Sequence, residues 1–394
     1  MIVPGKIIKD LHTGLKTRLN KWMNRTPLWV EFTLLLSAFL LTAACSGSDE
    51  APEEEHFSST GQGIFVLCEG NFNSGNASLS YYDPVTKQVE NGVFQRANGR
   101  KLGDTGQSII LRNGVAYIAV ENSGIIWGID AETFRVKGQV TATGTNIINP
   151  RYVHFVSDTK AYVTDLYSPY INIINPQTFQ WTGSIATHQA ESRGYCSTEE
   201  MVQVGKYVYT NCWSYSNKLL VIDTETDEMV REITLSSWQP KSMKADKNGK
   251  LWVITDGGYS MEGDSFSDDI PHLYRIDALT GTVELDQALD SDEANVQIEM
   301  NSTKDVVYLI NNDIYRMDIT ASHVPVRPFI EAPKDANGRR HKLYGIGVNP
   351  RNGDIYVGDA VDYSQAGVVY RYDAAGTLID QFRVGINPNH FAFK

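Results

Sequence analysis

The chain contains 394 residues, of which 42% are hydrophobic and 21% are charged, and its formal net charge is −12. This hydrophobic content is sufficient for a packed core. The acidic excess argues against a basic surface that tracks phosphate groups, so nucleic acid is excluded as an expected partner.

Residues 1–44 are predicted to be a signal peptide. An apolar run from Leu34 to Ala44 is too short to span a bilayer, has Arg25 upstream and ends in small residues before Cys45. Met23 is an alternative start that would give a signal of ordinary length. The segment Leu41–Cys45 resembles a bacterial lipobox, in which the cysteine is lipidated after cleavage. We therefore expect a lipid anchor at Cys45, with an ordinary secreted protein as the alternative.

An acidic tether is predicted over residues 45–60. Five of the seven residues from 49 to 55 are acidic, and the segment has too little apolar content to fold. An acidic run close behind a lipidated cysteine resembles the signal that sends Bacteroidetes lipoproteins to the outer face of the outer membrane; a solvated periplasmic spacer is the alternative. The mature chain keeps 29 of 35 basic and 45 of 47 acidic residues, which leaves a formal charge of −16.

Residues 61–394 contain one phrase seven times: an apolar run ends in an acidic or amide residue, and turn-forming residues follow. The marked residues are Asp83, Asp130, Asn175, Asp223, Asp277, Asp318 and Asp373, which recur every 41 to 55 residues. A short alternating run rich in Val, Ile and Tyr precedes each copy, and Asn-Gly pairs such as Asn113-Gly114 indicate hairpins. We therefore predict an all-β, seven-bladed β-propeller of four-stranded antiparallel blades. The period is too short for tandem β-sandwiches and too long for a β-helix.

The chain ends predict how the ring closes. The first repeat begins at Ile64 with the second strand of a blade and has no first strand of its own. After the last repeat, the segment Asn389–Phe393 resembles the first strand of the other blades. We therefore expect the C-terminal strand to join the first blade, which leaves no large open sheet edge.

Three cysteines follow Cys45. Cys196 and Cys212 flank a predicted hairpin of the fourth blade, so a disulfide between them is possible in an oxidising compartment, and a pair of free thiols is the alternative. Cys68 occupies the position in the first blade that Cys212 has in the fourth, and we expect it to be a buried apolar residue.

One face of the predicted ring is the expected binding surface. The loops between the second and third strands, and the connections between blades, are long and open on this face. They are rich in Tyr, Trp and Asn, which suit a bulky amphipathic ligand or a protein partner, although many of these aromatic residues can serve to pack the blades. The candidate ligand contacts are Tyr167, Tyr170, Trp213, Tyr215, Trp238, Tyr259, Arg339, Tyr344 and Tyr363.

Catalysis and metal binding have little support. The chain lacks a Gly-x-Ser-x-Gly elbow, a His-Glu-x-x-His motif and a phosphate loop. Four histidines are predicted on or near the open face and are the candidate acid–base groups: His154, His188, His341 and His390. The oxygen-rich loop Asp256–Asp269 has no EF-hand spacing, so a solvated acidic loop is favoured over calcium binding. We expect no cofactor and no metal, and keep a propeller lyase or hydrolase as the enzymatic alternative.

The turns Ile222–Thr226 and Ile276–Gly281 resemble those of the YncE-like propeller family, and the opening Val66–Asn76 with Leu102–Gln107 resembles surface lipoprotein propellers of gut Bacteroidetes. The resemblance spans residues 61–394. It implies a cell-surface protein of the outer membrane that captures a bulky nutrient, with cobalamin or another corrinoid as the candidate, for a TonB-dependent transporter. A surface-layer component or protein-interaction platform without a small-molecule ligand is the alternative. Cys68 stands where related sequences often have asparagine, so that contact is not carried over.

Overall fold

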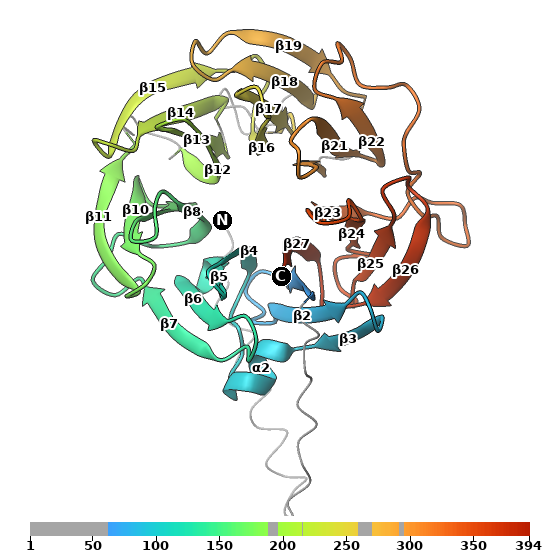
Figure 1. Cartoon of the computed structure of the whole chain (residues 1–394), viewed down its shortest axis with the longest axis horizontal. Coiled ribbons are helices and arrows are strands. Elements are labelled where there is room, and N and C mark those ends of the chain that lie inside the picture. The colour runs from blue at the N-terminus through green and yellow to red at the C-terminus, as the bar shows by residue number, and fades with distance from the viewer. Residues whose placement is uncertain (1–61, 188–195, 215, 259–269, 291–294) are drawn as a thin grey trace, which may run out of the picture. The chain divides into compact units, whose positions relative to one another are not determined.

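The computed structural model describes residues 62–187, 196–214, 216–258, 270–290 and 295–394. The chain divides into the units Met1–His56 and Phe57–Lys394, and all described residues belong to the second. In this unit seven antiparallel sheets surround a central axis as the blades of a ring (Figure 1). The predicted all-β, seven-bladed propeller is confirmed. Among the described residues, no helix is both long and apolar enough to cross a membrane.

From the axis outward, the first three blades contain β27 (Pro388–Phe393), β1 (Ile64–Cys68), β2 (Ser78–Asp83) and β3 (Gln88–Asn91); β4 (Gly106–Arg112), β5 (Val115–Val120), β6 (Ile125–Asp130) and β7 (Val136–Thr141); and β8 (Pro150–Phe155), β9 (Ala161–Asp165), β10 (Tyr170–Asn175) and β11 (Gln180–Ala186). A short helix α2 (Val93–Asn98) links the first two blades, and a 3₁₀ turn Glu121–Ser123 follows β5.

The remaining four blades contain β12 (Ser197–Val204), β13 (Tyr207–Trp213), β14 (Lys218–Asp223) and β15 (Glu228–Thr234); β16 (Pro240–Ala245), β17 (Lys250–Thr255), β18 (His272–Asp277) and β19 (Val283–Ala288); β20 (Val296–Met300), β21 (Val306–Asn311) and β22 (Asp313–Asp318); and β23 (Leu343–Val348), β24 (Ile355–Asp359), β25 (Val368–Tyr372) and β26 (Leu378–Arg383).

Packing between blades explains the hydrophobic pattern of each repeat. The second strand of a blade has a neighbouring blade on both faces, so β5 is buried at every position. The outermost strand borders solvent, so exposed and partly buried positions alternate along β15. A near-continuous apolar run followed by an alternating one is therefore the signature of one blade.

The residue that marks each repeat makes an Asx turn between the third and fourth strands. In every repeat the side-chain oxygen of this Asp or Asn accepts a hydrogen bond from the backbone N–H two residues later or three residues later. Examples are Val85 N to Asp83 Oδ1 at 2.8 Å and Thr280 N to Asp277 Oδ1 at 2.8 Å. A short carboxylate or amide is needed for this turn, which is why the residue type recurs.

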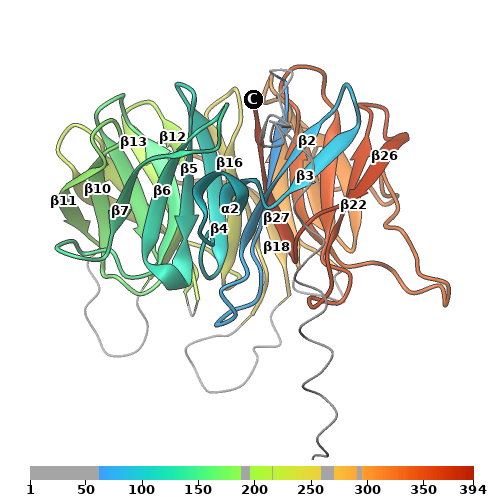
Figure 2. The same ribbon diagram turned by 90° about the horizontal axis from the view of Figure 1, so that it is seen from below.

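The sixth blade departs from the other six because its fourth strand is reduced to a single bridge between Ile314 and Ile330. The segment that should form this strand contains Pro325 and Pro328. Proline has no backbone N–H to donate to a ladder, so a regular strand cannot form there. The chain instead continues as an irregular connection from Ile319 to Lys342, and this arm projects at the lower right of Figure 2.

The ring closes through antiparallel pairing of β27 with β1, with Ile64 opposite Phe393 and Val66 opposite Phe391. The prediction that the C-terminal strand completes the first blade is confirmed. The seventh blade packs closely on this strand: a Cβ on Gly345 would lie 2.1 Å from the carbonyl oxygen of Asn389. Glycine is therefore required where β23 crosses β27.

The two cysteines of the fourth blade form a disulfide. Cys196 directly precedes β12 and Cys212 lies in β13, and their Cα atoms are 4.8 Å apart. Cys68 is fully buried as expected, and burial raises the pKa of its thiol to about 12.

Deletion of residues 389–394 should lower the melting temperature by about 10 °C or more, because it exposes the edge of β1 and removes two packed phenylalanines. Differential scanning calorimetry measures the effect. Leu378→Ala, at an exposed position of β26, is the control and should leave the melting temperature nearly unchanged. Equal melting of the deletion variant and the wild type would refute ring closure by this strand.

Replacement of Cys196 and Cys212 by alanine should lower the free energy of unfolding by about 3 kcal/mol, since the bond closes a loop of 16 residues. Urea unfolding with and without dithiothreitol measures this loss. The reductant should destabilise the wild type and have no further effect on the double variant; insensitivity of the wild type would contradict the disulfide.

Candidate functional site

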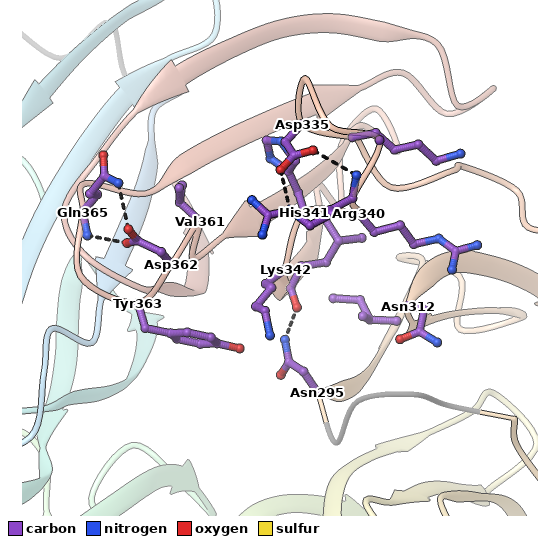
Figure 3. Close-up of a pocket in the computed structure, with 15 residues that line it drawn as sticks. Asn295, Asn312, Asp335, Arg340, His341, Lys342, Val361, Asp362, Tyr363 and Gln365 are labelled. Carbon is purple, nitrogen blue, oxygen red and sulfur yellow. Dashed lines mark hydrogen bonds and ion pairs between the residues drawn. The ribbon is translucent and has the colours of Figure 1, made fainter.

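Two hollows lie side by side on the face formed by the long loops, and Asn295 lines both. We call the first the loop pocket; it lies between the connection 334–343 and the loop 361–365, and its volume is about 1010 Å³ (Figure 3). We call the second the channel mouth; it lies at the ring axis and its volume is about 460 Å³. Both volumes are in the range of small-molecule sites.

Basic side chains dominate one wall of the loop pocket. Lys334, Arg339, Arg340 and Lys342 all come from the arm that replaces the missing strand of the sixth blade. A small hairpin holds them: Lys334 bridges Arg340, and Asp335 N donates to the carbonyl of Arg339 at 2.8 Å. Arg339 Nε donates to Asp335 Oδ2 at 2.8 Å, and the side chain of Arg339 remains 78% exposed. The hairpin therefore places basic side chains at the loop pocket of a protein whose net charge is negative.

The opposite wall is built around Tyr363. Its backbone has φ 63°, and the amide of Asn71 donates to its carbonyl oxygen at 2.6 Å, so a loop of the first blade fixes a loop of the seventh. The ammonium of Lys342 lies 5.7 Å from the centre of the Tyr363 ring. The ring of Tyr344 meets it edge-on at 5.8 Å and marks the boundary with the channel mouth. The Tyr363 ring is thus an aromatic surface on a hydrogen-bonded loop, and it lies next to the cation of Lys342.

His341, which lines the loop pocket and is partly buried, is hydrogen-bonded to a buried aspartate. Its Nδ1 lies 2.5 Å from Oδ2 of Asp359, whose side chain is fully buried, and the hydroxyl of Tyr370 lies 3.4 Å from the same carboxylate oxygen. Burial, with the carboxylate of Asp359, raises the pKa of Tyr370 above its usual range. These bonds orient the imidazole from within the blade and fix the start of β23.

All seven inner strands contribute to the channel mouth and the channel beneath it. At its entrance Arg151, on β8, forms ion pairs with Glu121 and Glu199; its Nε donates to Glu199 Oε2 at 2.9 Å. All three residues are at most 9% exposed. The two carboxylates raise the pKa of Arg151 although burial disfavours its charged form. Burial raises the pKa of Glu199 to about 7 against the opposing effect of Arg151.

Glu69 also lines the mouth, and Asp256 adjoins it through Trp213. The hydroxyl of Tyr344 donates to Glu69 Oε2 at 2.5 Å, and Trp213 Nε1 donates to Asp256 Oδ2 at 3.0 Å. Burial raises the pKa of both acids. Burial also lowers the pKa of Lys241, while Asp256, Glu69 and Glu199 act in the opposite direction. The mouth thus contains more buried acids than bases.

Deeper in the channel, Lys244 forms ion pairs with Glu200 and Glu299. His390 lies among these groups, and burial lowers its pKa to about 3, with Lys244 and Arg151 adding to the effect. The imidazole is therefore neutral at physiological pH, and its ring meets that of Tyr152 edge-on at 5.5 Å.

The structure distributes the predicted contacts over both hollows. Arg339 and Tyr363 line the loop pocket, and Tyr167, Trp213 and Tyr344 line the channel mouth. The structure does not bring Tyr170 or Trp238 into either hollow: Tyr170 begins β10, paired with Ala186, and Trp238 lies in the connection before β16, where its carbonyl accepts from Gly257 N at 3.2 Å.

Several predicted residues lie outside the described part of the chain: Cys45, His188, Tyr215, Tyr259 and the calcium-loop residues 259–269. Among the described residues, no group of three or more His, Cys, Asp or Glu side chains is arranged to hold a metal ion. The placement of His154 on the open face is wrong. It lies near the far end of β8, where its Nε2 is 3.2 Å from Gln203 Oε1, because an inner strand carries its last residues to the tight-turn face.

Sequence reasoning missed the charged residues of the channel mouth, above all Arg151, Glu199 and Lys241. Each stands within the first three residues of an inner strand, in the third, fourth and fifth blades. A charged residue at this position in three successive repeats is a signal that the sequence contains. It becomes interpretable only once the strand starts and the axis are known.

Comparison with known proteins assigns a family. A family model described as a domain of unknown function, DUF5074, matches residues 62–393. The chain belongs to the DUF5074 family. No curated protein sequence matches it.

Solved structures similar to this DUF5074 protein share its fold at low identity. A quinonprotein alcohol dehydrogenase-like protein from Bacteroides thetaiotaomicron has a TM-score of 0.60 at 15% identity, covering 84% of this chain and 78% of the other. A putative 6-phosphogluconolactonase from Bacteroides uniformis has 0.60 at 14%, covering 85% and 100%. Hydrazine synthase from Kuenenia stuttgartiensis has 0.57 at 16%, covering 72% and 88%. These identities support the propeller fold alone.

The raised pKa of Glu199 predicts a pH effect on stability. A carboxyl whose pKa rises on folding binds more protons in the folded state, so between pH 4.5 and about 7 it makes the free energy of unfolding fall as the pH rises. Glu199→Gln should flatten this decline by up to about 1.4 kcal/mol per pH unit. Urea unfolding across this range measures the slopes. Glu232→Gln, at an exposed position of β15, is the control, and parallel curves for Glu199→Gln and the wild type would contradict the prediction.

Proposed function

We propose that the protein is a non-enzymatic capture protein that binds a bulky nutrient in the loop pocket, with cobalamin or another corrinoid as the candidate ligand. The observation that carries this proposal is the size and lining of the pocket. A volume of about 1010 Å³ is at the upper end of small-molecule sites, and cations, amides and a held tyrosine ring surround it.

The lining suits the chemistry of a corrinoid. Such a ligand has a flat macrocycle edged with amide side chains, and cobalamin also carries a phosphodiester. Tyr363 offers an aromatic surface to the macrocycle, and the amides of Asn295, Asn312 and Gln365 can pair with ligand amides. The exposed guanidinium of Arg339 is a partner for a phosphodiester.

The proposed location is the outer surface of the outer membrane, with the lipid at Cys45 and residues 46–60 as tether. This part of the proposal rests on the sequence pattern of the first 60 residues, which lie outside the described part of the chain. A lipid anchor keeps a binding protein close to an outer-membrane protein, so a TonB-dependent transporter is the proposed recipient of the ligand.

A protein-interaction platform is the second candidate, and one observation favours it. Phe72, Ile148 and Tyr167 belong to loops of the first three blades on the long-loop face, and they are 58%, 49% and 52% exposed. Exposed aromatic residues at the edge of a hollow are typical anchors in protein interfaces. This apolar side of the face lies in blades other than those that form the loop pocket, so the two candidates use different residues.

Isothermal titration calorimetry with cyanocobalamin tests the first candidate. We expect saturable binding at micromolar protein, and Arg339→Ala should weaken it about tenfold because a charge-assisted hydrogen bond is lost. Val326→Ala is the matched control, since this residue is 93% exposed on the same arm and does not line the pocket. If the wild type gives no binding heat, corrinoid capture is refuted. Co-purification of a transporter with a protein that has no small-molecule affinity would favour the protein-interaction platform.

A further inference from the structure

The channel mouth is lined by more acidic than basic side chains, and several of these acids are buried. Glu121 and Glu199 line it and are at most 4% exposed, and Glu69, which also lines it, is half-buried. Asp256, 8% exposed, lies behind the rim, where it accepts a hydrogen bond from Trp213. Arg151 and Lys241 are the cations that act on these acids. A buried carboxylate is costly unless a cation or several hydrogen bonds stabilise it. The arrangement therefore has a deficit of positive charge.

One oxygen shows where this deficit is greatest. Glu199 is 3% exposed and lines the mouth, and its Oε1 accepts no hydrogen bond from the described residues. Arg151 Nε lies 2.8 Å from this oxygen, but it directs its N–H to Oε2 of the same carboxylate. Arg151 Nη1 turns to Glu121. Oε1 is thus a buried acceptor on a residue that lines the hollow: it has an ion-pair contact with Arg151 but no hydrogen-bond donor among the described residues.

The edge of the mouth adds aromatic surface. Trp213, Tyr167 and Tyr344 line it, and the guanidinium of Arg151 already lies 5.8 Å from the centre of the Trp213 ring. Aromatic faces favour organic cations over hydrated ions of the same charge. Around 460 Å³ is also more than a single metal ion needs, and Arg151 and Lys241 would repel a divalent ion.

We propose that the channel mouth is a second binding site, which takes the primary ammonium group of an organic amine. An ammonium group brings three N–H donors and one positive charge, which match Glu199 Oε1 and the neighbouring carboxylate of Glu69. The same chemistry is present in a free alkylamine and in a lysine side chain of a partner. This site involves neither the arm of the sixth blade nor Tyr363, so the proposal can be tested independently of corrinoid capture.

Titration of the full mature protein with butylammonium chloride, followed by calorimetry and tryptophan fluorescence, tests the site. We expect saturable binding that tetramethylammonium chloride does not reproduce, since that ion has the charge but no N–H donor. The same titration is carried out with a peptide that has a single internal lysine. Tighter binding of the peptide assigns the site to a protein partner, and tighter binding of the alkylamine assigns it to a free ligand.

Two variants with opposite expected effects separate binding from loss of fold. Glu199→Gln should weaken butylammonium binding about tenfold, because the charge-assisted hydrogen bond is lost. Lys241→Met should strengthen it, because a competing cation is removed from Glu69, Glu199 and Asp256. Glu232→Gln, on the outer strand β15, should match the wild type. Equal affinity for butylammonium and tetramethylammonium, or weaker binding in Lys241→Met, would overturn the proposal.

Discussion

The pairing of β27 with β1 is the contact on which the rest of the structure depends. A propeller blade buries its second strand only when a blade lies on each side of it, so an open ring would leave two apolar faces in water. Pairing the C-terminal strand with the first blade fixes the ends of the ring to each other. The glycines of β23 show how closely the seventh blade must approach this strand, since Gly345 leaves no room for a side chain.

Closure of the ring has an electrostatic consequence at the axis. Seven inner strands bring side chains from distant parts of the sequence into one narrow space, where Arg151 meets Glu121 and Glu199. Charged groups in this space lose much of their hydration, which is why the pKa of Glu199 rises and that of His390 falls. The scaffold thus determines the protonation of the groups that a ligand at the axis would meet.

The loop pocket has a different origin, because it depends on a defect in the repeat. Pro325 and Pro328 prevent a regular fourth strand in the sixth blade, and the released chain forms an arm. The basic hairpin of this arm then faces Tyr363 across a hollow. The irregular sixth blade therefore provides one wall of the loop pocket, and the loop 361–365 of the seventh blade provides the other.

The amino-acid sequence by itself determined the number of blades, the Asx turns and the closing strand, because these depend on local patterns such as the Asp or Asn of each repeat and the orphan segment Asn389–Phe393. It also indicated five of the ligand contacts and two of the histidines that line the two hollows, since aromatic and basic residues near loops are visible as such. Only the tertiary structure decided that Arg151, Glu199 and Lys241 share one buried site. They lie in three different repeats, and their environment depends on the ring geometry, which no local pattern contains.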